Sequence, residues 1–511
     1  MAGRSGTRTR VGIVDLIARK PSTSLKAKVV KPNYAAIMPQ ALGVWAEELG
    51  HDVQYLTYTG VEDLTRELPQ DIDILFLCSF TTAAYLAYSI SNMYRKQGVV
   101  TVLGGPHARA YPTDAIRHFD FVLGFTDKRL IADLLLGYAG NPDEGVRLSA
   151  DRQPLDLPSL RQRWKFICHN RDKARMLRVA PMIGSLGCPY TCSFCVDAEV
   201  DYQPLPYDQM KEDLAFVQRE VTKPIVAWHD PNFGVRFDDY MALIEESTTP
   251  GSVQFMAEST LSLLSEDHLQ RLQRNGFKMM IVGLESWFDY NNKARQGTNS
   301  GFDKVNSAAE HVRLVAQHIP YVQANFIFGL DADDGAAPFE MTKKFIDLAP
   351  SAIPVYTMFT SFGTSSPLDL EMQNAGRVLD LPHPFVDGQS ALNITLKNYS
   401  YAEFLDHYIG LFDHTFSLGA VWRRFSSNSH PLTSGARWAQ LLRAKSSIGK
   451  GRSRALRRMR QLLDANSDVR SFFNGEGGPV PSVFRHRIKA DLGPFYEHLP
   501  RTVLGHLDNE H

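Results

Sequence analysis

Three of the five cysteines in the chain lie within eight residues, at Cys188, Cys192 and Cys195. Thiolates are the soft ligands that iron–sulfur clusters use, and a C-x3-C-x2-C loop can wrap three of them around one cube of iron and sulfur. A ferredoxin-like electron carrier supplies four cysteines per cluster, whereas Cys78 and Cys168 belong to other segments. Three ligands would leave one iron open to an exogenous molecule. The alternatives are a zinc knot, which needs a fourth Cys or His that the loop lacks, and chance clustering of three thiols.

A regular series of strands and helices is expected to position this loop. The predicted strands over residues 179–390 are MIGSLG, PIVAWHD, SVQFMAES, KMMIVGLES, YVQANFIFGL and AIPVYTMFTSF, each followed by a helical pattern. Six β/α units predict a (β/α)6 partial barrel, whose active site lies at the carboxyl ends of its strands. The cysteine loop follows the first strand and is therefore expected at that edge.

A second α/β series occupies residues 11–137. Its predicted strands are VGIVDLI, HDVQYLTY, DILFLC, VVTVLGG and FDFVLGF, with helical patterns between them. Strands that alternate with helices predict a doubly wound parallel sheet, which binds its ligand beyond the carboxyl ends of the strands. The loops expected to reach a ligand are Leu16–Pro39, Ser79–Thr82, Gly104–Arg109 and Gly124–Lys128.

The fold class is therefore α/β, with an N-terminal doubly wound sheet, a central partial barrel and a C-terminal region that is mainly helical. The remaining boundaries place a flexible N-terminus at residues 1–10, a connector at 138–178 and the helical domain at 391–511. A length of 511 residues is too great for one hydrophobic core and agrees with several domains.

Composition narrows the class of protein. A net charge of −1 provides no global field to attract nucleic acid, and an odd count of five cysteines argues against a secreted disulfide framework. The basic N-terminus is not followed by an apolar segment of signal-peptide type. The 21 uncharged residues between Asp73 and Arg95 hold too many Ser, Thr, Asn and Tyr for a lipid-facing helix. We therefore expect a cytoplasmic protein that binds no nucleic acid.

The cysteine loop and the barrel pattern around it resemble the radical S-adenosylmethionine superfamily over residues 180–385. The resemblance implies a 4Fe-4S cluster whose open iron binds S-adenosylmethionine. It also implies that Phe194 packs near the adenine, that Glu285 and Ser286 contact the methionine or ribose part, and that the segment from Asn325 to Gly329 runs along the adenine.

A second matching segment is Ala227–Phe233 (AWHDPNF), which resembles the "Asp-x-x-Phe" sequence of the subfamily with an N-terminal cobalamin-type domain. His229 and Asp230 within it are interpreted either as functional groups at a strand end or as parts of a structural turn.

The N-terminal series looks like the cobalamin-binding domain of the same subfamily, through DIDILFLCSFTT, VVTVLGGPHARAYPTDAI and FDFVLGF. The resemblance implies that two loops approach the nucleotide tail of cobalamin, with Ser79, Thr81, Gly104, Gly105 and His107 as the contacts. Glycines allow the backbone to come close to a ligand, and they would also suit a tight strand-to-helix turn.

Two positions depart from the pattern of that domain. The family's Asp-x-His-x-x-Gly signature for a lower cobalt ligand is replaced by DLIARK, with Ile17 in place of the His. Its acidic Gly-Glu-Gly-Glu is replaced by Gly124-Phe125-Thr126-Asp127. The resemblance therefore implies a corrinoid that is bound without a histidine below the cobalt. The alternative is a domain that keeps the fold and has lost the cofactor.

The resemblance implies a radical enzyme that forms a 5'-deoxyadenosyl radical and methylates an unactivated carbon with the help of cobalamin. The alternative is a radical cyclase, oxidase or rearrangement enzyme whose N-terminal domain transfers no methyl group. An electron donor such as flavodoxin or ferredoxin is implied in both cases, together with a small-molecule substrate of unknown identity.

The segment from Arg443 to Arg460 carries eight basic residues and no acidic one, and apolar residues fall on one face of a helix up to Leu463. One interpretation is a peripheral membrane contact through residues 443–463, or a docking site for an anionic or lipid-like substrate. The other is the cationic outer face of an ordinary packed helix.

Overall fold

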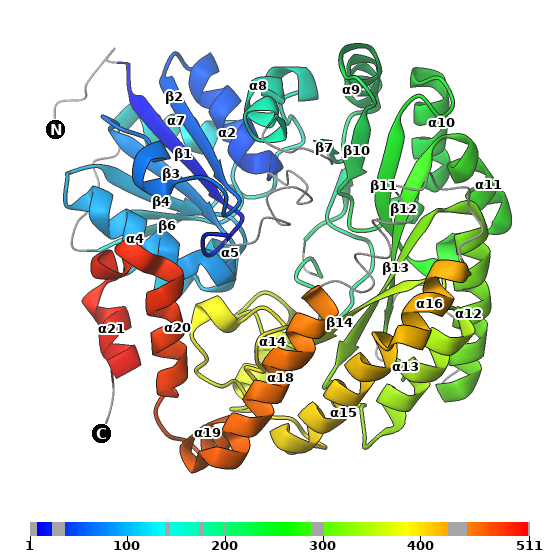
Figure 1. Cartoon of the computed structure of the whole chain (residues 1–511). Coiled ribbons are helices and arrows are strands. Elements are labelled where there is room, and N and C mark those ends of the chain that lie inside the picture. The colour runs from blue at the N-terminus through cyan, green and yellow to red at the C-terminus, as the bar shows by residue number, and fades with distance from the viewer. Residues whose placement is uncertain are drawn as a thin grey trace.

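The computed structural model describes residues 8–22, 36–137, 144–172, 178–198, 200–288, 301–427 and 447–508. These residues form two six-stranded sheets in which all neighbouring strands are parallel, and one antiparallel ribbon of two strands. The two sheets lie at opposite sides of the molecule in Figure 1, and the C-terminal helices run from one to the other. The predicted α/β class with two parallel sheets is confirmed.

The N-terminal sheet is doubly wound, because its first strand lies inside the sheet. Its strands, in spatial order, are β2 (Asp52–Tyr58), β1 (Arg10–Leu16), β3 (Ile74–Ser79), β4 (Val100–Gly104), β5 (Phe121–Leu123) and β6 (Val146–Leu148). Its helices are α2 (Ile37–Glu48), α3 (Leu64–Glu67), α4 (Ala84–Arg95), α5 (Pro106–Ala110), α6 (Pro112–Ala115), α7 (Lys128–Gly137) and α8 (Leu160–Arg171). Strand β6 and helix α8 lie within residues 138–178, the range predicted to be a connector, so the sheet extends beyond residue 137.

The second sheet is the predicted partial barrel. Its strands, in order, are β7 (Val179–Met182), β10 (Ile225–Trp228), β11 (Gln254–Ser259), β12 (Phe277–Glu285), β13 (Tyr321–Phe328) and β14 (Ile353–Met358). Its helices are α9 (Tyr207–Glu220), α10 (Phe237–Ser247), α11 (Glu266–Arg274), α12 (Gly301–His318), α13 (Ala337–Leu348) and α14 (Pro367–Asn374). Segment MIGSLG, expected as one strand, divides between the end of β7 and a short strand β8 (Ser185–Leu186), which pairs with β9 (Gln203–Pro204).

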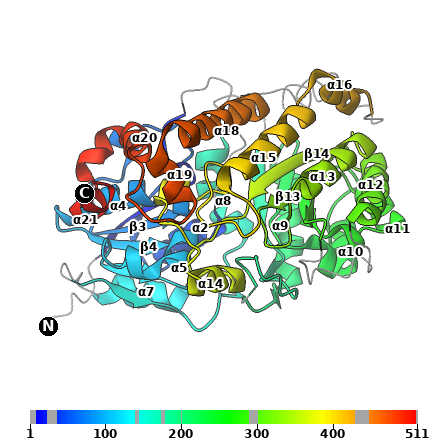
Figure 2. The same ribbon diagram turned by 90° about the horizontal axis from the view of Figure 1, so that it is seen from below.

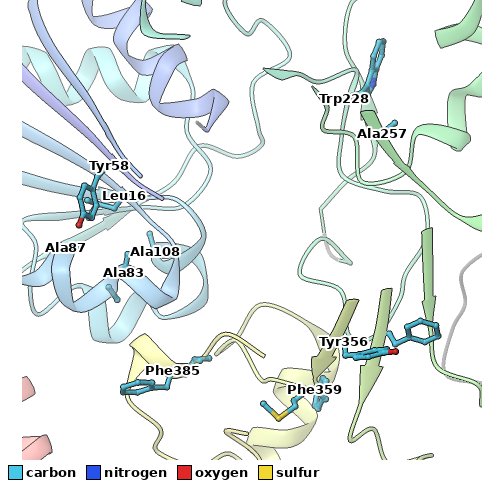
Figure 3. Packing of buried hydrophobic residues seen from close by; sticks show 14 of the residues in the cluster. Leu16, Tyr58, Ala83, Ala87, Ala108, Trp228, Ala257, Tyr356, Phe359 and Phe385 are labelled. Carbon is cyan, nitrogen blue, oxygen red and sulfur yellow. The ribbon is translucent and has the colours of Figure 1, made fainter. Parts of the chain in front are cut away.

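Alternating burial along the barrel strands separates an outer from an inner face. On β13, Phe326 and Phe328 are buried; Phe326 meets Phe345 of α13 edge to face, and Phe328 stacks on Phe339 of the same helix. The alternate residues, such as Asn325, are only half-buried and face the other way, toward the inside of the barrel. Figure 3 shows part of both cores, with Leu16 and Tyr58 at the N-terminal sheet and Trp228 and Tyr356 in the barrel.

The C-terminal region is helical, as predicted, and connects the two sheets. It comprises α15 (Tyr401–Thr415), α16 (Leu418–Ser426), α18 (Ser447–Ala465), α19 (Ser467–Phe473), α20 (Ser482–Leu492), the 3-10 helix η5 (Gly493–His498) and α21 (Arg501–Asp508). Helices α15 and α18 lie side by side near the barrel, whereas α20 and α21 lie beside the N-terminal domain (Figures 1 and 2). There the Asn92 side chain of α4 donates a hydrogen bond to the His498 carbonyl, at 2.8 Å.

Helix α18 contains most of the basic segment; residues 443–446 lie outside the described residues. Its apolar residues Leu456, Met459 and Leu463 are buried in the core of the protein. Two of its arginines form ion pairs with α15, Arg457 with Asp413 and Arg460 with Asp406. These contacts are those of an ordinary packed helix. In the described part of the chain, no helix combines the length and the hydropathy that crossing a membrane requires.

Candidate active site

The three-cysteine loop leaves the barrel through the β8–β9 ribbon. Ser185 and Leu186 pair with Pro204 and Gln203, so the loop begins and ends on one rigid support. Gly187, just before the first cysteine, has a φ of +65°, and a Cβ at that position would lie 2.4 Å from the Val200 carbonyl oxygen. Only glycine fits this turn without strain, so Gly187 fixes the direction in which the loop starts.

Asp230 anchors the entrance of the same loop from the end of β10. Its carboxylate accepts hydrogen bonds from the backbone N–H of Gly184 at 2.5 Å, from the Ser185 hydroxyl at 2.6 Å and from the Tyr240 hydroxyl at 2.5 Å. The side chain is buried, and burial raises its pKa even though these donors lower it. Asp230 is therefore a structural anchor, whereas the neighbouring His229 is exposed.

The three thiols differ in their burial. Cys192 is only 2% exposed, whereas Cys188 and Cys195 are half-buried. The backbone N–H of Cys195 donates to the Cys192 carbonyl at 2.9 Å, which makes a tight turn between the second and third cysteine. Among the described residues, the three sulfurs do not all converge to within 4.8 Å, as ligands of one ion would.

The cysteine loop contacts the N-terminal domain. Arg109, at the end of α5, donates a hydrogen bond to the Val196 carbonyl at 3.3 Å and lies 3.9 Å from the Asp197 carboxylate. Nearby, the backbone N–H of Thr364 donates to the Ala110 carbonyl at 3.0 Å. The carboxyl end of β4 therefore meets the loop that follows β7. The sequence offered no signal for Arg109, because a lone arginine in a loop belongs to no motif.

The predicted S-adenosylmethionine residues Glu285 and Ser286 lie at an irregular end of β12. Glu285 has a φ of +58°, an unfavourable conformation for a residue with a side chain, and the strand register shifts between Gly283 and Glu285. Lys304, which is buried, donates a hydrogen bond to the Ser286 carbonyl at 2.6 Å and supports this bulge. Backbone strain of this kind is typical of functional sites, because packing must maintain it against its cost.

The other predicted S-adenosylmethionine residues occupy different surroundings. Phe194 is partly buried against the core, and Asn325 is half-buried on the inner face of β13, where its side-chain oxygen accepts a hydrogen bond from Gln323 at 2.9 Å. Gly329 is buried with a φ of +91°, and an added Cβ would lie 2.9 Å from Leu396. Gly329 thus makes a turn that packs against the segment after the barrel.

The loop after β4 contains two glycines with different surroundings. At Gly104, an added Cβ would have no atom within 4 Å. At Gly105, φ is +89° and an added Cβ would lie 2.8 Å from the Cys78 sulfur. The backbone of Gly104 therefore borders open space at the carboxyl edge of the sheet, whereas Gly105 packs directly on β3.

Beside Gly105, Asp15 at the end of β1 is almost completely buried. One carboxylate oxygen accepts a hydrogen bond from the backbone N–H of Ala36 at 2.9 Å, and the thiol of Cys78 is a second partner. Burial raises the pKa of Asp15 to about 7.

Side chains of the other expected cobalamin contacts face the protein. Ser79 and His107 are fully buried and Thr81 is nearly so. The Ser79 hydroxyl donates to the Phe80 carbonyl at 2.8 Å, and His107 Nε2 lies 2.6 Å from the Tyr88 hydroxyl. Of the five expected contacts, only the two glycines expose surface at this edge.

Comparison with known proteins gives two kinds of relative. No protein-family model matches the chain. The bacteriochlorophyllide d C-12(1)-methyltransferase of Chlorobaculum tepidum is 24% identical over 337 residues, which cover 64% of this chain and 72% of that protein. The bacteriochlorophyllide d C-8(2)-methyltransferase of the same organism is 24% identical over 317 residues, covering 57% and 66% respectively.

Two solved structures share the fold over most of the chain. The radical S-adenosylmethionine methyltransferase TsrM from Kitasatospora setae, with cobalamin and a 4Fe-4S cluster bound, has a TM-score of 0.52 and 15% identity, and the match covers 89% of this chain and 99% of that one. The cobalamin-dependent radical enzyme OxsB has a TM-score of 0.55 and 13% identity, with coverage of 98% and 81%. In sequence the chain is therefore similar to two methyltransferases, and in fold it is similar to cobalamin-dependent radical S-adenosylmethionine enzymes, which confirms the resemblance predicted from its cysteine loop.

Proposed function

We propose that this chain is a radical S-adenosylmethionine enzyme that uses cobalamin to methylate an unactivated carbon of a small molecule. The observation that carries the proposal is the contact between the Gly104–Arg109 loop and the cysteine loop, made by Arg109 and Val196. This contact places the ligand-binding edge of the doubly wound sheet beside the cysteine loop of the barrel.

The residues fit the expected cofactors in their chemistry. Cys188, Cys192 and Cys195 would hold the 4Fe-4S cluster, because three thiols in one loop, which starts from the β8–β9 ribbon, supply all but one of its ligands. The strained Glu285 and its neighbour Ser286 would hold S-adenosylmethionine, with Phe194, Asn325 and Gly329 as the expected adenine side.

The corrinoid would lie along the backbone of Gly104, because a Cβ added to this residue would meet no atom within 4 Å. Gly105, Ser79, Thr81 and His107 would then shape this edge from behind. With its cofactors bound, such a site supplies a 5'-deoxyadenosyl radical and a transferable methyl group.

For the substrate and the electron donor, we propose only a chemical class. TsrM has been solved with tryptophan as substrate, and a small molecule is the substrate class that we propose for this chain. We further propose an electron donor of flavodoxin or ferredoxin type and a cytoplasmic location. A peripheral membrane contact through residues 443–463 stays a prediction; the described apolar residues Leu456, Met459 and Leu463 of α18 pack in the core.

The experiment that tests the proposal separates methyl transfer from other radical chemistry. Full-length protein with a reconstituted cluster is offered excess corrinoid, desalted and incubated anaerobically with S-adenosylmethionine and a reductant. We expect retained corrinoid, and formation of both 5'-deoxyadenosine and S-adenosylhomocysteine, the second of which should stop in corrinoid-free protein. Protein that retains no corrinoid and forms only 5'-deoxyadenosine would instead be a radical cyclase, oxidase or rearrangement enzyme.

A further inference from the structure

A group of metal-ligating side chains lies behind the expected corrinoid edge and shares His107 with it. His107, Asp114 and His383 come from α5, α6 and the 3-10 helix η4 (His383–Phe385), and their ligand atoms all lie within 4.8 Å of one another. It is the only three-residue group of His, Cys, Asp or Glu with this convergence in the described part of the chain. His383 Nε2 lies 2.9 Å from an Asp114 carboxylate oxygen.

A fourth polar atom completes the group. The Tyr88 hydroxyl lies 2.6 Å from His107 Nε2 and donates to the same Asp114 oxygen at 2.8 Å. Ligands of a tetrahedral zinc ion, with bonds of about 2.0–2.1 Å, lie about 3.3 Å apart. The three contacts of 2.6, 2.8 and 2.9 Å would each have to lengthen by about 0.4–0.7 Å to admit an ion between these atoms.

The second polar atoms of His107 and Asp114 have neighbours of their own. Nδ1 of His107 faces the Thr81 hydroxyl at 3.4 Å. The second carboxylate oxygen of Asp114 faces His118 at 3.8 Å and Arg117 at 3.9 Å. Metal ligands in proteins are oriented by outer contacts of this kind, which fix the ring tautomer and the carboxylate direction.

Aromatic rings enclose the group. Tyr111 lies against both histidines, with ring centroids 5.3 Å from His107 and 4.5 Å from His383, and Tyr85 lies 5.7 Å from His383.

We propose that His107, Asp114 and His383 bind one divalent transition-metal ion of the zinc type, with the Tyr88 hydroxyl or a water as the fourth ligand. Two imidazoles and one carboxylate suit such an ion better than calcium or magnesium, which prefer oxygen ligands. The group contains no sulfur, so it is distinct from the iron–sulfur site.

The ion would have a structural role. His107 and Asp114 follow the Gly104–Gly105 turn, whereas His383 follows the barrel in sequence. A metal shared by these segments would fix the loop that borders the proposed corrinoid position to the segment after the barrel. The proposal does not depend on the proposed methyl transfer.

The test uses the full-length protein with its iron–sulfur cluster, and zinc as the probe. Wild type and variants are titrated with Zn2+ against a competing chelator, and bound zinc and iron are measured by mass spectrometry. We expect wild type to retain one zinc per chain. His383→Gln and Asp114→Asn should weaken zinc binding at least tenfold at unchanged iron content. His414→Gln is the matched control, because it removes a His–Asp pair of 3.1 Å that belongs to no convergent group of three such ligands among the described residues.

X-ray absorption at the zinc edge of the wild-type protein identifies the ligands of the bound zinc, and it does not depend on how the variants fold. Nitrogen and oxygen scatterers at about 2.0–2.1 Å, with imidazole features, are the expected result. Sulfur at about 2.3 Å, or a wild type that binds no zinc more tightly than His383→Gln does, would overturn the proposal and leave the group as a hydrogen-bonded contact between the two segments.

Discussion

Substitution of the two glycines after β4 should separate corrinoid binding from folding. Gly104→Trp directs a large side chain into space where an added Cβ meets no atom within 4 Å. Gly105→Ala adds a single methyl group that meets the Cys78 sulfur at 2.8 Å and the Ser79 backbone nitrogen at 3.2 Å, on a backbone with φ of +89°. The larger substitution should therefore be the better tolerated one for folding.

The magnitudes follow from these surroundings. A side chain in the left-handed region costs about 1–2 kcal/mol, and overpacking a dense core costs about 1–3 kcal/mol. Gly105→Ala should therefore lower the free energy of unfolding by about 2–5 kcal/mol, whereas a substitution without such conflicts stays within about 0.5 kcal/mol.

Two assays measure the two effects. Urea unfolding gives the change in stability, and absorbance after desalting gives the corrinoid that each variant retains. Gly104→Trp should unfold at the same urea concentration as wild type and retain little corrinoid. A folded Gly104→Trp protein that keeps a full complement of corrinoid would refute the placement of the cofactor along this backbone, and a fully stable Gly105→Ala would refute the steric argument.

Three further predictions concern the barrel and the buried carboxylates. Glu285→Ala and Glu285→Gly should both weaken S-adenosylmethionine binding at unchanged iron content. Glu285→Gly should be about 1 kcal/mol more stable than Glu285→Ala, because glycine relieves the positive φ of +58°. Equal stability of the two variants in urea would contradict the backbone strain at this position. Asp230→Ala removes the acceptor of three hydrogen bonds at the entrance of the cysteine loop, so reconstituted protein should bind less iron than Asp230→Asn; full iron loading of both would show that this anchor is dispensable. Burial raises the pKa of Asp15 in the folded protein to about 7, above its usual value, so the folded state favours the protonated carboxyl. The protonated carboxyl therefore contributes about 4 kcal/mol to the free energy of unfolding at pH 4, and this contribution is lost as the pH rises through 7. Asp15→Asn should therefore flatten the fall in unfolding free energy between pH 4 and pH 8, and an unchanged slope would argue against the burial of a charge there.

Much of the fold could be predicted from the sequence, because the strands are short β-branched runs between clear helical patterns. Five strands of each sheet fall at the expected positions. Strand β6 was missed because VRL is a three-residue edge strand with little apolar content. The division of MIGSLG into β7 and β8 depends on a hydrogen bond from Gly184 to the distant Asp230, which no local pattern contains.

The candidate site was predictable only where a motif existed. The cysteine loop and Glu285 follow from spacing and resemblance, but the positive φ of Glu285 is a property of the folded barrel. The sequence alone gave no reason to prefer Gly104 over Gly105, since only the position of Cys78 distinguishes them. His107, Asp114 and His383 converge from segments separated by up to 276 residues, so their proximity has no local signature.

The cysteine loop is the central feature of the proposed enzyme, and one comparison of two variants tests its role. Anaerobically reconstituted Cys192→Ala and Cys168→Ala proteins are supplied with S-adenosylmethionine and a reductant, and 5'-deoxyadenosine is measured against bound iron. Cys192 is the most buried thiol of the loop, whereas Cys168 lies on α8 outside it. Cys168→Ala should keep the iron and the cleavage of wild type, and Cys192→Ala should lose both. Cleavage of S-adenosylmethionine by Cys192→Ala at the wild-type rate would contradict the assignment of the loop as the ligand of a catalytic cluster.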